Sequence, residues 1–150
     1  MKLKSIIKQK LFDAFLRNWQ SDVTINNLCS NYRIIKENFG QEFYLRALPN
    51  DLRIILSKFR TGSHNLPIAD KRYDPIDERN TCPLCLTDVG DEYHFVMCCA
   101  AFNHIRPKYI PSRFISRPNT LTFYKLFTSE NIPTLTKLCK FLTIIMHVFR

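Results

Sequence analysis

Hydrophobic residues recur every four positions along the first part of the chain. The series consists of Leu3, Ile7, Leu11, Phe15 and Trp19, and it is widened by Ile6, Phe12 and Leu16. Residues four apart lie on the same side of an α-helix, so the pattern predicts an amphipathic helix from Lys2 to about Asp22. We expect its apolar stripe to pack into a core and its lysines to face outward.

Two further helical patterns follow after residues 23–32, which are less regular. A second helical pattern runs from Ile34 to Leu48 and is interrupted by Gly40. Another helix is predicted to begin at Pro49-Asn50 and to end at Gly62-Ser63. Its expected buried stripe consists of Leu52, Ile55, Leu56 and Phe59, and its polar side carries Arg53, Lys58 and Arg60.

The second half of the chain alternates between irregular and helical patterns. Residues 64–80 contain two prolines and no helical period, which predicts an extended, exposed segment anchored by Leu66, Ile68 and Tyr73. A helix is expected from about Tyr93 to Tyr109, followed by a loop over residues 111–119. Residues 121–129 and 135–149 then predict a helical hairpin, since Pro133 suits a first helical turn. The last helix is apolar over much of its circumference, so we expect it to be buried or to form an interface.

These patterns predict a mostly α protein with a small zinc-knuckle-like subdomain. With 150 residues, the chain can bury one normal core. We expect a single domain over 1–150, with a helical region about 2–62, an extended basic segment and zinc motif about 63–100, and C-terminal helices about 101–150. Only three glycines occur, which argues against a turn-dense strand-rich fold. The longest apolar run is interrupted by Lys140 and is too short to span a bilayer.

One motif indicates specific chemistry. Cys82 and Cys85 are separated by two residues, and His94 and Cys99 follow with four residues between them. Three sulfurs and one nitrogen at such spacing suit a tetrahedral Zn²⁺ ion. Four protein ligands fill the coordination sphere, so the predicted site is structural rather than catalytic.

The six cysteines could instead form disulfides or act in redox chemistry. An exported protein could pair them in disulfides, but lysines interrupt every apolar run near the N-terminus, so no signal-peptide core is found. We therefore expect an intracellular protein of the nucleus or cytoplasm, with reduced thiols. A redox role for Cys82 and Cys85 would call for a strand–helix context that the sequence lacks. Cys29 and Cys139 stand alone among apolar neighbours and are interpreted as buried thiols.

The identity of the fourth ligand stays open on geometry. If residues from Glu92 onward are helical, His94 and Cys98 share a face, whereas His94 and Cys99 point roughly 140° apart on an ideal helix. If His94 precedes the helix or lies in its first turn, Cys99 reaches the metal instead. Helical geometry alone slightly favours Cys98.

Charge suggests a polyanionic partner. The net charge is +9, and residues 1–72 carry thirteen Lys and Arg against six Asp and Glu. Nucleic acid, either RNA or DNA, is the first candidate. Acidic residues surround the cysteine motif and would repel phosphates there. The predicted phosphate contacts are Arg53, Lys58, Arg60, His64, Lys71 and Arg72, with Lys2, Lys4, Lys8 and Lys10 as secondary candidates. Tyr73 is either a base-stacking platform or a core anchor.

Three stretches together resemble the C-terminal region of non-LTR (LINE-type) retrotransposon reverse transcriptases. They are KFRTGSHNLPIADKRYD, IDERNTCPLC and DEYHFVMCCAAFNHIRPKYI. The segments FLRNWQ and ENFGQEFYL and the C-terminal helix that ends in Arg150 also resemble that region, so the likeness covers nearly the whole chain. The matching positions are Arg60, Gly62, Ser63, His64, Leu66, Ile68, Arg72, Tyr73, Glu78, Arg79, Cys82, Cys85, Glu92, His94, Phe95, Cys99, Phe102 and Arg106.

The resemblance implies a role and a ligand set. In that family the region is a zinc-binding accessory segment that grips template RNA or target DNA during target-primed reverse transcription, and its pattern places the fourth ligand at Cys99. The sequence departs from the pattern at Ala100, where a proline is usual, at Cys98, and by one extra residue before Cys82. No polymerase motif is found, so the resemblance implies a fragment or a short derived reading frame.

Three classes of function follow. The leading hypothesis is a non-catalytic zinc- and nucleic-acid-binding module with no small-molecule substrate. The rival is a zinc-stapled protein-interaction module whose last helix docks on a partner, such as a polymerase domain. An enzyme is disfavoured, because a zinc hydrolase needs an open metal position and a general base, for which Glu92 is the only candidate.

Overall fold

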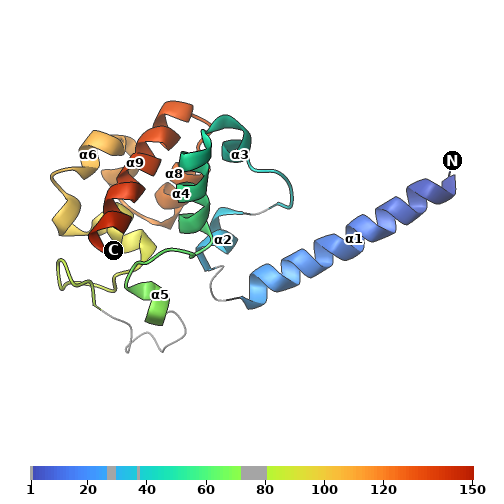
Figure 1. The fold of residues 1–150 in the computed structure, drawn as a ribbon, viewed down its shortest axis with the longest axis horizontal. Coiled ribbons are helices and arrows are strands. Elements are labelled where there is room, and N and C mark those ends of the chain that lie inside the picture. The colour runs from blue at the N-terminus through green and yellow to red at the C-terminus, as the bar shows by residue number, and fades with distance from the viewer. Residues whose placement is uncertain (1, 27–29, 37, 72–80) are drawn as a thin grey trace.

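The computed structural model describes residues 2–26, 30–36, 38–71 and 81–150. One long helix, α1 (Lys2–Ile25), projects from a body made of the other helices (Figure 1). The predicted mostly α class is confirmed, and no strand occurs in the described ranges. The helices of the body are α2 (Ser30–Ile35), α3 (Phe43–Ala47), α4 (Asn50–Arg60), α5 (Ile68–Lys71), η3 (His94–Cys98), η4 (Ala100–Phe102), α6 (Arg106–Tyr109), α7 (Ser112–Ile115), α8 (Thr120–Phe127) and α9 (Ile132–Val148).

The core is built around α9, which contacts α3, α4, α6 and α8. Leu138, Phe141, Leu142 and Ile145 of this helix are fully buried, as its apolar circumference predicts. The helix begins where Asn131 accepts a hydrogen bond from the backbone N–H of Thr134, with a proline in the first turn. The predicted burial of the last helix is therefore confirmed, and this helix presents no free apolar face.

The helices α4 and α8 meet within this core. Phe59 of α4 stacks on Phe127 of α8 with ring centroids 5.7 Å apart. At the start of α8, the side chain of Asn119 accepts a hydrogen bond from the backbone N–H of Thr122. The Thr122 hydroxyl in turn accepts one from the backbone N–H of Asn119. This reciprocal cap satisfies backbone groups that a helix start leaves open. The cap thereby fixes the α8 half of the predicted hairpin.

Two predicted helices are shorter than expected. The pattern over residues 34–48 becomes α2 and α3, which lie on either side of Gly40, whose φ is 151°. Such a backbone conformation is favourable for glycine alone, so the helix cannot continue through it. The predicted helix over residues 93–109 is also wrong as one unit. It breaks at Cys99, where ψ is 122°, into η3, η4 and α6.

The apolar stripe of α1 does not enter the core. Leu3 is 71 % exposed and Leu11 is 66 % exposed, and Ile6, Ile7, Phe12 and Phe15 are exposed as well. The helix itself was predicted, but the expected core packing of its stripe is wrong for these six residues. From Phe12 onward the helix contacts the body, where Phe39 makes edge-on ring contacts with Phe12, Phe15 and Trp19.

The side chain of Arg60 lies inside the body, although the helical pattern predicted an exposed cation. Arg60 is 1 % exposed. It donates to the carbonyl of Phe127 at 3.1 Å, pairs with Glu42 at 3.0 Å and lies over the ring of Tyr44. The prediction that Arg60 contacts phosphate is therefore corrected, because its charge is used to join α3, α4 and α8.

No helix within the described residues is long and apolar enough to cross a membrane.

Arg60→Ala should destabilise the body, because it leaves the buried Phe127 carbonyl without its donor and removes one of the cations beside Glu42. We expect the free energy of unfolding to fall by about 3 kcal/mol. Urea unfolding followed by circular dichroism measures this. The control is Lys58→Ala, two residues away and exposed, which should change stability by no more than about 0.5 kcal/mol. Equal stability of the two variants would contradict the structural role of Arg60.

Candidate metal centre

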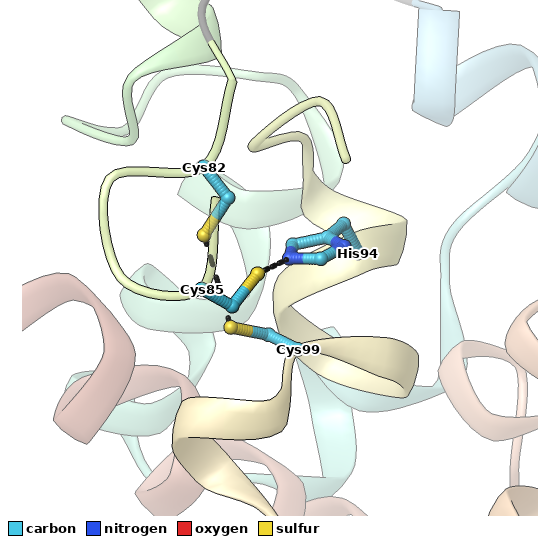
Figure 2. A group of neighbouring side chains, drawn as sticks. All are labelled: Cys82, Cys85, His94 and Cys99. Carbon is cyan, nitrogen blue, oxygen red and sulfur yellow. Dashed lines mark hydrogen bonds between the residues drawn. The ribbon is translucent and has the colours of Figure 1, made fainter. Parts of the chain in front are cut away.

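Four side chains from two segments converge on one point (Figure 2). The Sγ atoms of Cys82, Cys85 and Cys99 and a ring nitrogen of His94 all lie within 4.8 Å of one another. The Sγ atoms of Cys82 and Cys99 are 3.8 Å apart, and Cys85 Sγ lies 3.2 Å from His94 Nε2. These four ligands are close enough to hold a metal ion.

The cysteines are present as thiols. Cys82, Cys85, Cys98, Cys99 and Cys139 are all free. The 3.8 Å between Cys82 and Cys99 is far longer than the bond of about 2.05 Å in a disulfide. Cys139 is fully buried, as predicted, whereas Cys29 lies outside the described residues.

A tight turn presents the first two ligands. The backbone N–H of Leu86 donates to the carbonyl of Cys82 at 2.9 Å, and the N–H of Cys82 donates to the carbonyl of Asp88 at 2.7 Å. Leu86 has a φ of 59°, which few non-glycine residues adopt. The turn therefore folds back on itself and directs the thiols of Cys82 and Cys85 to the same side.

Gly90 lets this turn lie close to the segment that carries the other ligands. A Cβ atom at this position would lie 3.2 Å from the Cα of Cys82 and 3.2 Å from the ring of Phe95. Those contacts are tighter than ordinary van der Waals packing, and one of them involves backbone that cannot easily move. Glycine thus brings Cys82 within reach of Cys99.

The turn η3 decides which cysteine is the fourth ligand. The N–H of Cys99 donates to the carbonyl of His94 at 2.7 Å, a hydrogen bond between residues five apart. Such a π-helical turn is wider than an α-helical one and is frequent at functional sites. It places Cys99 beside His94 and leaves Cys98 exposed. Cys99 therefore joins the cluster, and the preference of ideal helical geometry for Cys98 is corrected.

Arg106 donates hydrogen bonds to this irregular backbone. Its Nε donates to the carbonyl of Val96 at 2.9 Å and its Nη2 to the carbonyl of Cys99 at 2.5 Å. Its Nη1 donates to Asn103 Oδ1 at 2.6 Å. The buried guanidinium thus supplies a donor to the carbonyl of Val96 and a second donor to that of Cys99, which also accepts from the N–H of Phe102 at 3.2 Å.

Two thiols of the cluster differ in acidity. A hydrogen bond from the Thr87 hydroxyl, above all, lowers the pKa of Cys85 to about 6. Burial, as the main cause, raises the pKa of Cys99 to about 12.

His94 Nδ1 is buried without a hydrogen-bond partner within the described chain. A bound cation would stabilise the thiolate of Cys99, because metal ligation replaces the lost hydration of the charge.

His64 lies beside the cluster and pairs with Glu92. His64 Nε2 is 2.7 Å from Glu92 Oε1, and both side chains are almost fully buried. The backbone N–H of Leu66 donates to His64 Nδ1 at 3.3 Å, so the ring proton lies on Nε2 and is donated to the carboxylate. The prediction of a phosphate contact at His64 is therefore corrected. Glu92 is likewise engaged in this pair rather than directed at the metal ligands.

The remaining predicted contacts fall into two groups. Arg53 and Lys58 line a groove on α4. The side chain of Lys71, and Arg72 and Tyr73 entirely, lie outside the described residues. Sequence reasoning missed Arg150, which lies near Lys58 although ninety-two positions separate them in the chain. No periodic pattern could have linked these two residues.

No protein-family model, no curated protein and no solved structure matches this chain. The assignment of the cluster therefore depends on its own chemistry.

Serine variants test the ligand set. Cys82→Ser, Cys85→Ser and Cys99→Ser should each lose bound metal, because a hydroxyl is a poor substitute for a thiolate. Cys98→Ser is the matched control and should keep it. Elemental analysis of the purified variants measures the metal-to-protein ratio. Loss in Cys98→Ser together with retention in Cys99→Ser would overturn the assignment.

Arg106→Ala tests the support of the π turn. We expect metal affinity to fall by roughly tenfold to a hundredfold, the usual effect of removing groups that orient ligands. Competition with a chromophoric chelator measures this affinity. Arg117→Ala, which removes an exposed cation in the same part of the chain, should leave it unchanged. An unchanged affinity in Arg106→Ala would mean that the turn needs no support from this side chain.

Proposed function

We propose that the protein is a non-catalytic nucleic-acid-binding module whose fold is stabilised by a bound Zn²⁺ ion. We further propose that it is an accessory segment of the LINE-type reverse transcriptase kind, which engages RNA or DNA during target-primed reverse transcription. The observation that carries the proposal is a groove along α4 that bears cations and, among the described residues, no acidic side chain.

The spacing of the cluster supports zinc. Two sulfurs at about 2.3 Å from a tetrahedral ion lie about 3.8 Å from each other. Cys82 and Cys99 are separated by 3.8 Å. Soft thiolates with one imidazole favour Zn²⁺ over Mg²⁺ or Ca²⁺, which prefer oxygen ligands. Four protein ligands leave no position for a water molecule, so this centre would hold structure rather than activate a nucleophile.

The groove supports binding to a polyanion. Its first part, about 420 Å³, lies against α4 between Leu45 and Ser63. A second part, about 280 Å³, continues toward the end of α9 and shares Ile54, Lys58 and Ser63 with the first. Arg53, Lys58 and Arg150 provide positive charge along this path. A continuous row of cations suits the phosphates of a nucleic-acid backbone.

The two main cations are held differently. Arg53 Nη1 donates to the carbonyl of Leu45 at 2.9 Å, so its guanidinium is fixed at the wall of the groove. Lys58 is exposed one turn further along the same helix. A fixed guanidinium loses little entropy on binding, whereas a lysine acts as a movable point charge. Together they can grip a backbone without reading its sequence.

The zinc centre and the groove are physically connected. Glu92 lies two residues before His94, and its partner His64 follows Ser63 of the groove. Loss of metal should therefore loosen the His64–Glu92 pair and disturb the groove. In this proposal zinc affects nucleic-acid binding through the fold rather than through direct contact.

The resemblance to the retroelement region gains support from the roles of the matching residues. Gly62 has a φ of 69° at the end of α4, which glycine tolerates best. His64 pairs with Glu92, and Arg106 binds the carbonyl of Cys99. A motif built from such residues preserves a fold around a metal. This is the pattern expected of a structural metal site and not of a catalytic one.

The salt dependence of binding tests the proposal. The zinc-loaded chain should bind a fluorescent single-stranded RNA or DNA in low salt and lose affinity steeply between about 50 and 200 mM salt. Arg53→Ala with Lys58→Ala should reduce the slope of log affinity against log salt by about one unit per lost phosphate contact. Fluorescence anisotropy at several salt concentrations measures both effects.

The matched control is Lys125→Ala with Lys137→Ala, which removes two exposed cations from α8 and α9 outside the groove. It should keep the parental slope. Absence of binding at low salt would reject the nucleic-acid proposal. An equal loss in both double variants would reject the groove as the binding surface.

A further inference from the structure

Residues 2–11 of α1 form an amphipathic surface that lies apart from the body of the described structure. Leu3, Ile6, Ile7 and Leu11 are between 50 % and 71 % exposed, and Phe12 and Phe15 extend this surface toward the body. Figure 1 shows this part of the helix projecting away from the other elements. Contiguous exposed apolar side chains of this size mark interaction sites in folded proteins.

The charges along the same half are of one sign. Residues 2–12 contain four lysines and no Asp or Glu. The first turn has no acidic residue, although the positive end of a helix dipole favours one. Lysines in this position oppose the dipole, and the repulsion weakens the helix. An anionic partner at this end would relieve both effects.

The cations lie next to the apolar side chains rather than on the opposite side. Lys4 is one helical turn from Ile7, and Lys8 is one turn from Leu11 and Phe12. Burial of this surface in lipid would place Lys4 and Lys8 within the buried face, so their side chains would have to extend back to the headgroups. Pairing of two copies of this segment would bring two sets of lysines together. A surface that offers carboxylates beside apolar residues satisfies both kinds of side chain.

We propose that the segment Leu3–Phe15 of α1 binds an acidic amphipathic helix of another protein. Apolar residues of that helix pack on Ile7 and Leu11, and its carboxylates pair with Lys4 and Lys8. This interaction is separate from nucleic-acid binding at α4, because the groove lies on the body and none of its lining residues belongs to α1. The helix-in-groove mode of recognition uses the same combination of apolar anchors and complementary charge.

A pair of synthetic helices tests the proposal with the full-length chain. One labelled peptide carries leucines at core positions and glutamates beside them, and its twin has lysines in place of the glutamates. The chain should bind the glutamate peptide and discriminate against the lysine peptide. Fluorescence anisotropy gives both dissociation constants.

Two double variants assign the contacts. Ile7→Ala with Leu11→Ala keeps helix propensity and should weaken binding of the glutamate peptide by at least about tenfold. Lys4→Glu with Lys8→Glu should reverse the preference between the two peptides. The control, Leu121→Ala with Ile132→Ala, removes exposed apolar side chains from α8 and α9 and should have no effect.

Four results would overturn the inference. These are no binding of the glutamate peptide, equal binding of the twins, dimerisation of the free chain in sedimentation, or tighter binding to anionic lipid vesicles than to the peptide. Nucleic-acid affinity of Ile7→Ala with Leu11→Ala should equal that of the parent chain. The α1 proposal and the α4 proposal can therefore fail independently.

Discussion

The requirement that four ligand atoms meet at one point shapes the backbone around it. Cys82 and Cys85 belong to a turn, whereas His94 and Cys99 belong to a helical segment that an ordinary α-helix would misalign. The π turn corrects the alignment, and Gly90 removes the side chain that would hold the segments apart. Arg106 ties the two ends of the irregular backbone together by donating to the carbonyls of Val96 and Cys99. The π turn, the glycine and the arginine each make sense only when the turn with Cys82 and the segment with His94 lie side by side.

Buried charge has a structural role elsewhere in the body too. Arg60 joins Glu42 to the end of α8, and His64 joins Glu92 to the start of the segment after α4. Arg60 has a carboxylate and a carbonyl as partners, and the Glu92 carboxylate accepts a hydrogen bond from the His64 ring, which is the condition under which burial of a charge is tolerated. High net charge therefore overstates the cationic surface. On α4 the cations at the groove are Lys58, which is exposed, and Arg53, which the Leu45 carbonyl holds through one hydrogen bond.

Features that depend on interactions between residues close in the chain were predictable from the sequence, whereas features that depend on distant residues were not. The helices α4, α8 and α9 were predictable, because periodicity, prolines and capping residues act over a few positions. The metal ligands were predictable as a spacing, but Cys99 required either the retroelement resemblance or the π turn itself. The burial of Arg60 depends on Phe127, sixty-seven positions away. A helical pattern also does not predict whether another element will cover its apolar stripe, as α1 demonstrates.

The exposed stripe of α1 raises the question of what keeps the helix formed. Its second half packs its aromatic rings on Phe39, which provides one fixed end from which helical hydrogen bonds can propagate. Residues 2–11 project from the body, and their lysines oppose the helix dipole. Intrinsic propensity alone gives marginal stability to a helix in water. The physical balance at α1 therefore favours fraying of its first turns unless an apolar and anionic surface covers them.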